Sequence, residues 1–251
     1  MDAILDALAA QQDELSDLLA ERSEAEWRCA SPCAGWTVAD VVLHLAQTNE
    51  LTIASVQGRL PAVAEGMGAG PGRSGTVDDR AEEMVAAQRD LPVRELHERW
   101  LTGVDTLRAV LATADPHQRV MWVAGKLSIR TLATTRLAET WIHTGDVAAA
   151  LGVTLPATDR LSHIARLAWR TLPYAFARAG RELSGPVAFE LRSPTGTAWD
   201  FIPDADPVTV VRGDALELCL VAARRADPAH TGLHGEGPDA DAVLELVRTY
   251  A

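Results

Sequence analysis

The chain has 251 residues, 47% of them hydrophobic, which suffices for one large folded domain or two small ones. Its formal net charge of -12 repels phosphate backbones and anionic lipids, so nucleic acids and membranes are poor candidates for partners. The sequence shows no signal-peptide pattern and no apolar run of the ~18 residues that a membrane span needs. Its three cysteines are too few for a disulfide framework. We therefore expect a cytoplasmic protein that acts on a small-molecule substrate.

Helical patterns dominate the first two thirds of the chain. Apolar residues at three- and four-residue steps predict helices at 2–22, 37–57, 77–114, 128–151 and 158–179. Pro92 predicts a break within the third of these, whereas Ser128 and Gly152 are placed to begin and end the fourth. Residues 58–76, rich in glycine, proline and alanine, are expected to form a mobile loop, and 115–127 a plain connection.

The pattern changes near Gly180, where alternation of apolar and polar residues replaces helical spacing. Strands are expected at 187–192, 198–202 and 208–211. The turns between them predict hairpin-linked antiparallel strands, and short helical patterns follow at 215–223 and 239–249. Helical patterns come first along the chain and strand patterns come last. This order indicates an α-helical bundle, residues 1–183, followed by a small α+β domain with an antiparallel sheet, residues 184–251.

Glu139 and His143 lie four residues apart in a predicted helix, so they share one face with Cβ atoms roughly 5–6 Å apart. Their oxygen and nitrogen atoms can converge on a divalent metal, which needs donors about 2.0–2.2 Å away. His44, in the second predicted helix, is the candidate third donor. Such a pair is also common on a solvent-exposed helix face, and a lone histidine on an apolar helix is more often a core residue. However, an apolar helix gains little from inward Glu and His side chains unless something binds them, which favours a metal site.

Three further polar residues are candidate catalytic residues. Asp40 is placed to complete a capping box with the threonine three residues earlier, and it also lies one turn before the candidate histidine, where it can orient the imidazole. The cap is the favoured interpretation. Asp146 has the same two interpretations, three residues after the second histidine. Arg136 can bind an anionic group or pair with the glutamate one turn later.

Cys33 precedes the second predicted helix, where a helix N-terminus can lower the pKa of a thiol. No histidine lies near it in the sequence to activate it, so we interpret it as a small buried residue. Its spacing from Cys29 is not that of a zinc finger, and no second cysteine pair exists.

Two segments resemble a known family. The stretch SPCAGWTVADVVLHL, from Ser31 to Leu45, is similar to the entry segment of the mycothiol-dependent maleylpyruvate isomerase family, part of the DinB-like four-helix metalloprotein superfamily. The stretch RLAETWIHTGDVAAALG, from Arg136 to Gly152, is similar to the second metal segment of that family. The order and separation of the two segments also match. The resemblance covers nearly the whole chain, because the family often carries a small C-terminal α+β domain.

The resemblance implies that His44, Glu139 and His143 are the three protein ligands of one divalent metal, with water or substrate completing the coordination sphere. Zinc is the expected metal, and nickel or iron is also compatible with this donor set. The implied activity is that of a metal-dependent isomerase or transferase, in which the metal deprotonates the thiol of mycothiol. Two alternatives remain: a thiol-independent metal-dependent lyase, cyclase or hydrolase of specialised metabolism, and a non-catalytic metal-binding module.

Overall fold

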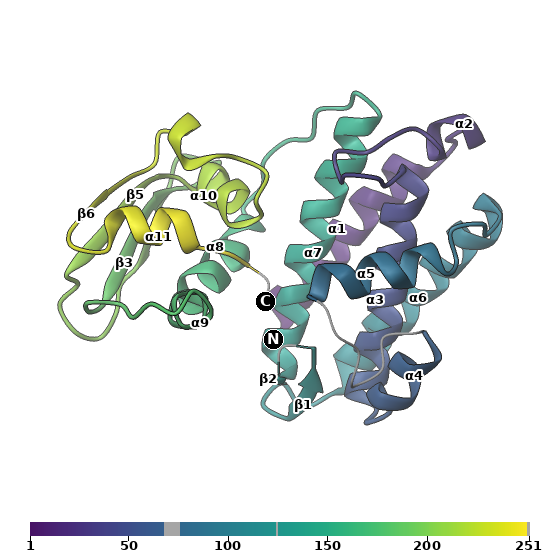
Figure 1. The fold of residues 1–251 in the computed structure, drawn as a ribbon, viewed down its shortest axis with the longest axis horizontal. Coiled ribbons are helices and arrows are strands. Elements are labelled where there is room, and N and C mark those ends of the chain that lie inside the picture. Colours follow the sequence, from purple (N-terminus) through teal and green to yellow (C-terminus); the bar gives the residue numbers. More distant parts are fainter. Residues whose placement is uncertain (68–75, 124, 250–251) are drawn as a thin grey trace. The chain divides into compact units, whose positions relative to one another are not determined.

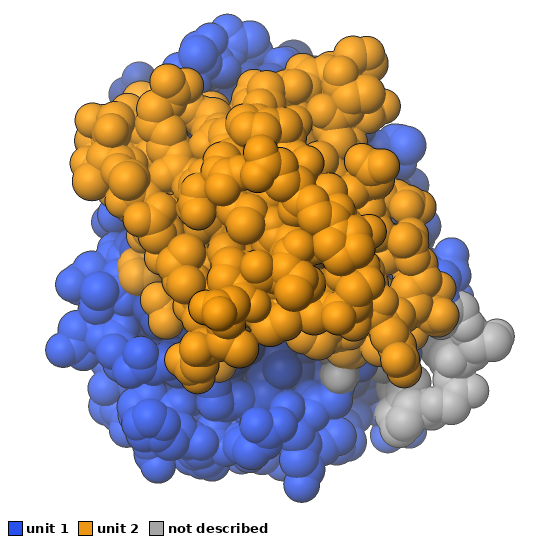
Figure 2. Space-filling model, turned by 90° about the vertical axis from the view of Figure 1, so that its left-hand side faces the viewer, with its two compact units in different colours: residues 1–155 blue, residues 156–251 orange. Residues whose placement is uncertain are grey.

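The structure, a computed structural model, describes residues 1–67, 76–123 and 125–249. The chain divides into two compact units, Met1–Leu155 and Pro156–Ala251, which are coloured blue and orange in Figure 2. Within the described ranges, no helix combines the length and the apolar composition needed to cross a bilayer.

The N-terminal unit is a helical bundle (Figure 1). Its described elements are α1 (Asp2–Leu19), α2 (Glu24–Trp27), α3 (Val38–Val56), α4 (Leu60–Gly66), α5 (Val77–Ala86), α6 (Val93–Thr113), β1 (Arg119–Trp122), β2 (Gly125–Ser128) and α7 (Ile129–Ala150). The long helices pack in a closed ring, with α1 against α7, α7 against α3, α3 against α6, and α6 against α1. Ser55, near the end of α3, donates a hydrogen bond to the carbonyl of Met121, shortly before α7. His44 lies beside His143, near the end of α7, so α3 and α7 run antiparallel.

The boundaries of these helices follow from local hydrogen bonding. Thr37 caps α3 by accepting a hydrogen bond from the backbone N–H of Asp40, whose carboxylate accepts one from the backbone N–H of Thr37. Ser128 caps α7 by accepting from the backbone N–H of Thr131. Pro92 stands immediately before α6, which confirms the predicted break between α5 and α6.

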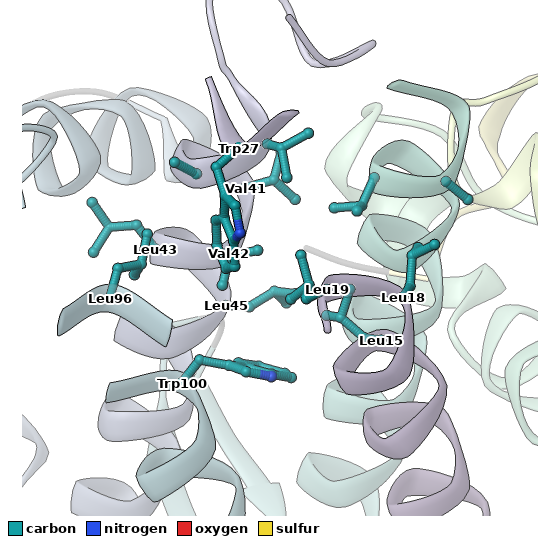
Figure 3. Packing of buried hydrophobic residues seen from close by; sticks show 14 of the residues in the cluster. Leu15, Leu18, Leu19, Trp27, Val41, Val42, Leu43, Leu45, Leu96 and Trp100 are labelled. Atoms are coloured by element: carbon teal, nitrogen blue, oxygen red, sulfur yellow. The ribbon is translucent and has the colours of Figure 1, made fainter. Parts of the chain in front are cut away.

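The apolar core of this unit lies where α1, α3 and α6 meet (Figure 3). Its largest members are Trp27, which is 2% exposed, and Trp100, which is fully buried. Leu15 and Leu45 are also fully buried within the same cluster. The indole N–H of Trp100 donates to Oγ of Ser16 at 3.4 Å, so the polar group of the ring is satisfied. Burying each large apolar side chain contributes roughly 1.5–3 kcal/mol, so this cluster stabilises the bundle substantially.

Two segments that we predicted as irregular contain regular structure. Residues 60–66 form α4, because Pro61 lies in the first turn of the helix, where the missing N–H costs nothing and the fixed φ suits a helix. The remainder of that predicted loop includes 68–75, which lies outside the described residues. The predicted connection at 115–127 contains β1 and β2, which pair as an antiparallel hairpin.

The C-terminal unit combines a sheet with short helices. Its described elements are α8 (Leu161–Arg170), α9 (Leu172–Arg178), β3 (Val187–Arg192), β4 (Ala198–Phe201), β5 (Thr209–Asp214), α10 (Ala215–Ala222), the 3₁₀ turn η1 (Pro228–His230), β6 (His234–Glu236) and α11 (Ala240–Leu246). The strand order is β4-β3-β5-β6. β3 pairs antiparallel with β4 but parallel with β5. The prediction of a wholly antiparallel sheet is therefore wrong. After β4 returns along one edge of β3, the chain crosses to the other edge, so β5 runs in the same direction as β3.

The segment predicted as one helix at 158–179 forms α8 and α9. Pro173 lies in the first turn of α9 and has no N–H to continue the hydrogen bonding of α8. α8 packs against α10 and β4, with Leu161, Ile164 and Leu167 buried. The compact units consequently divide after Leu155, whereas our predicted boundary follows residue 183. Periodicity shows that a segment is helical, but not which apolar surface it covers.

Replacing Trp100 with alanine is expected to lower the free energy of unfolding by about 3–5 kcal/mol, because it opens a large cavity in the core. The neighbouring Leu101, which is 40% exposed on the same helix, provides the control, and Leu101→Ala is expected to cost less than about 1 kcal/mol. Urea unfolding measures both values. Equal losses in the two variants would contradict this assignment of the core.

Candidate metal centre

The three predicted ligands lie together between α3 and α7. Nε2 of His44 is 3.6 Å from Oε2 of Glu139, and Nε2 of His143 is 3.7 Å from the same oxygen. One donor atom from each residue lies within 4.8 Å of the other two. A tetrahedral metal with bonds of about 2.0–2.2 Å separates its ligand atoms by roughly 3.3–3.6 Å, so this spacing is close to that around a single ion.

Hydrogen bonding does not account for the approach of His143 to Glu139. Nδ1 of His143 is 2.9 Å from Oδ2 of Asp146. Because an ionised carboxylate only accepts, we assign the ring proton to Nδ1, which leaves a lone pair on Nε2. The carboxylate of Glu139 also presents lone pairs, and its separation of 3.7 Å from that nitrogen exceeds a hydrogen bond. Facing lone pairs repel each other unless a cation lies between them, so the donor set fits a metal ion.

His44 is suited to act as a neutral ligand. Burial lowers its pKa, and the side chain favours the uncharged form that a metal requires. Nδ1 of this ring is buried and has no hydrogen-bond partner among the described residues. The indole of Trp36 lies against the imidazole, with ring centroids 5.2 Å apart, and limits its orientation.

Glu139 remains ionised in this environment. Burial by itself would raise its pKa, but the contact with His44, the neighbouring His143 and the positive charge of Arg136 outweigh burial and lower the pKa to about 2. The side chain keeps 23% of its surface exposed, compared with 11% for each histidine. Of the three candidate ligands, the carboxylate is therefore the most accessible to an incoming small molecule.

Arg136 lies one turn before Glu139 and is only 1% exposed. Nε and Nη2 have no hydrogen-bond partner in the described part of the chain, and no ion pair with Glu139 is formed there. Burial lowers the pKa of this guanidinium, and the charge of Glu139 offsets the effect in part. Arginine nevertheless stays protonated in proteins, so a buried positive charge stands beside the candidate ligands without a direct partner among the described residues.

Asp40 has the structural role that we favoured. Its Oδ2 accepts from the backbone N–H of Thr37 at 2.8 Å, and its Oδ1 accepts from Nε of Arg89 at 3.1 Å. No hydrogen bond joins Asp40 to His44 in the described structure. The alternative, in which Asp40 orients the imidazole directly, therefore has no contact that supports it.

The structure brings Cys33 to the site, which the sequence did not suggest. Its Sγ donates to Oδ2 of Asp146 at 3.2 Å and lies 4.0 Å from Nδ1 of His143. The sequence favours a small buried residue at Cys33, because no histidine is near it in the sequence. The only signal in the sequence was the position of Cys33 in the turn before α3. Because α3 and α7 run antiparallel, a residue that precedes α3 lies close to the end of α7.

Comparison with known proteins agrees with this architecture. Residues 8–148 match the family model described as the mycothiol maleylpyruvate isomerase N-terminal domain. The chain belongs to this family. It is 32% identical over 245 residues to an uncharacterised protein found in two strains of Mycobacterium tuberculosis, an alignment that covers 97% of this chain and 93% of the relative.

Two solved structures share the fold. The crystal structure of the mycothiol-dependent maleylpyruvate isomerase has a TM-score of 0.63 and 19% identity, with 95% of each chain covered. A mutant of that enzyme gives a TM-score of 0.62 and 20% identity, with the same coverage. The isomerase family fold, a helical bundle followed by a mixed sheet with helices, therefore extends over nearly the whole chain.

Replacing Asp40 with alanine is expected to lower the free energy of unfolding by about 1–3 kcal/mol, because it removes a helix cap and leaves Arg89 without this partner. Metal binding by the folded variant is expected to match that of wild type. Asp79 forms the same capping box on the exposed start of α5, so Asp79→Ala is the matched control and should cost about 1 kcal/mol or less. Loss of metal from folded Asp40→Ala would instead assign Asp40 to the metal centre.

Proposed function

We propose that the chain is a metal-dependent enzyme in which His44, Glu139 and His143 hold one divalent ion, preferentially zinc, and that its reaction is of the thiol-dependent isomerase or transferase type. The observation that carries the proposal is the convergence of three lone-pair donors at separations that suit metal coordination and not hydrogen bonding. Three protein donors are typical of a catalytic zinc site, which keeps a position for water or substrate.

Bound there, a divalent metal would supply Lewis-acid chemistry, either by lowering the pKa of a thiol or water or by polarising a carbonyl group. The residues of the chain prepare this chemistry. Asp146 keeps the proton of His143 on Nδ1, which directs the lone pair of Nε2 towards the other ligands. The indole of Trp36 lies against the His44 ring, with the two ring planes tilted by 47°, and limits the orientation of the imidazole.

The buried charges favour an anionic ligand. Asp146 and Glu139 contribute two negative charges, while Arg136 and a divalent ion contribute three positive ones. Asp40 does not change this balance, because it is paired with Arg89. One positive charge is left uncompensated in a region of low dielectric, where it is costly. A thiolate or a carboxylate would neutralise it, and we assign to Arg136 the role of attracting that group.

The comparisons support the thiol-dependent form of the proposal over a thiol-independent lyase, cyclase or hydrolase. The family model carries mycothiol in its description, and the solved enzyme with the same fold is a mycothiol-dependent isomerase. The same three ligands would serve either chemistry, so the identity of the substrate is a separate question from that of the metal site.

Purified wild type is expected to bind zinc at one ion per chain, whereas His44→Ala, Glu139→Ala and His143→Ala are expected to lose it. Metal analysis after dialysis measures the stoichiometry. In a thermal unfolding assay, zinc at a hundredfold excess over its Kd should stabilise wild type by about 2.7 kcal/mol and leave the variants unchanged. His117→Ala, which removes an exposed histidine, is the control and should behave as wild type. Stoichiometric zinc in all three folded ligand variants would refute the site.

Replacing Arg136 with methionine is expected to weaken the binding of mycothiol to the zinc-loaded protein by about tenfold, since ~1.4 kcal/mol of electrostatic attraction is lost. Zinc binding itself should be retained, because the loss of a positive charge does not repel the cation. Calorimetric titration measures both affinities. Arg130→Met, which changes an exposed arginine on the same helix, is the control. If zinc-loaded wild type binds no mycothiol, the thiol-dependent reaction is wrong and a thiol-independent one replaces it.

A further inference from the structure

The turn that carries Cys33 is held together by backbone hydrogen bonds of its own. Its ends are joined by a hydrogen bond from the backbone N–H of Ser31 to the carbonyl of Trp36, at 2.9 Å. Within the turn, the backbone N–H of Trp36 donates to the carbonyl of Cys33 at 3.0 Å, and Gly35 has a φ of 79°. Glycine suits this left-handed conformation, since it has no Cβ to clash. The thiol is therefore presented by an ordered backbone.

The thiol of Cys33 shares one acceptor atom with a candidate metal ligand. Oδ2 of Asp146 lies 3.2 Å from Sγ of Cys33 and 2.9 Å from Nδ1 of His143. Asp146 is only 2% exposed, and these contacts contribute to the orientation of its carboxylate. Two donors on one oxygen fix the plane of a carboxylate more tightly than one donor does, and hydrogen bonds to an ionised group are the stronger kind.

The other two cysteines do not have this arrangement. Sγ of Cys29 donates to the carbonyl of Ala150 at 3.8 Å, and Sγ of Cys219 donates to the carbonyl of Leu161 at 3.8 Å. Both are longer contacts to neutral backbone groups. Cys33 is thus the cysteine whose thiol donates to a charged side chain, and that side chain is bonded to a candidate metal ligand.

Cys33, His143 and Asp146 also have the composition of a small metal site. The distance of 2.9 Å between Nδ1 and Oδ2 argues against this interpretation, because it is the length of a hydrogen bond and leaves no room for an ion between the atoms. The geometry instead favours a chain of two hydrogen bonds that ends on the candidate metal centre.

We propose that Cys33 is a positioning residue of the metal centre: its thiol fixes the Asp146 carboxylate, which in turn keeps the proton of His143 on Nδ1 and the lone pair of Nε2 directed towards the metal. The effect on metal affinity rests on the proposed function. The effect on the His143 tautomer does not, because both hydrogen bonds join side chains of this chain alone. Groups that orient a ligating histidine typically contribute 10–100-fold to metal affinity.

The first experiment uses metal-free protein labelled with ¹⁵N-histidine and records long-range ¹H–¹⁵N correlations of the imidazole rings. Wild type is expected to show His143 as a single tautomer protonated at Nδ1. Cys33→Ala should show a mixture of tautomers, whereas Cys33→Ser should retain the wild-type signal, because its hydroxyl can donate to the same oxygen. Cys29→Ala, which removes a thiol from the same segment, is the control and should change nothing. An unchanged tautomer in Cys33→Ala would overturn the proposal.

A double-mutant comparison shows whether Cys33 acts on the His143 tautomer through Asp146 or through packing in general. In an Asp146→Asn background, Cys33→Ala should add no further change to the tautomer, because the carboxylate on which the thiol acts is already absent. An equal effect of Cys33→Ala in both backgrounds would contradict the proposal. Should Cys33→Ala fail to fold, Cys33→Val removes the donor while filling the space, and the same outcomes apply.

The second experiment measures zinc affinity and the visible spectrum of the cobalt-substituted protein. Cys33→Ala is expected to weaken zinc binding by about tenfold, with most of the affinity restored in Cys33→Ser. Cobalt-loaded wild type should show no thiolate-to-cobalt charge-transfer band, and the presence of that band would make Cys33 a direct ligand and overturn the proposal. If wild type binds neither metal, the proposed function fails, and the tautomer experiment still decides the role of Cys33.

Discussion

The packing of α3 against α7 is the contact on which the candidate site depends. α3 brings His44, and α7 brings Glu139 and His143, so neither helix holds the three donors alone. The two helices run antiparallel, which places the start of one beside the end of the other. A slip of one helical turn would move the donors by about 5.4 Å, more than their present separations, and the cluster would be lost. The capping of α3 by Thr37 and Asp40 and of α7 by Ser128 therefore matters to the site as well as to the helices.

The interior between these helices opposes the stability of the bundle. A carboxylate, two imidazoles and a guanidinium lie there. Nδ1 of His44 and two nitrogens of Arg136 have no hydrogen-bond partner among the described residues, and each such buried group is destabilising by about 1–3 kcal/mol. The apolar cluster around Trp27 and Trp100 provides the compensating stabilisation elsewhere in the same unit. A fold that keeps such a costly group of side chains in its interior is consistent with a binding site, because ligands that neutralise the charge also stabilise the folded state.

Membership of the isomerase family and a shared fold establish the architecture of this chain. A structural match at 19% identity does not determine which substrate is used, since the same scaffold hosts different reactions when the residues around the metal change. In this chain those residues include Arg136, a buried charge beside the ligands, and Cys33, which acts on the site through Asp146.

The sequence by itself determined most of the helices, because periodicity and capping residues such as Ser128 act locally. It also indicated the pairing of Glu139 with His143, since residues four apart in a helix always share a face. His44 was the candidate third donor from its place on an apolar helix, and the resemblance to a family then implied that it is a ligand. Only the tertiary structure showed that β5 runs parallel to β3 and that α8 joins the C-terminal unit, because strand order and helix partners depend on contacts distant in the sequence. For the same reason the contact of Cys33 with Asp146 was not predictable: it joins residues that are 113 positions apart, and it arises only when the turn before α3 packs against the end of α7.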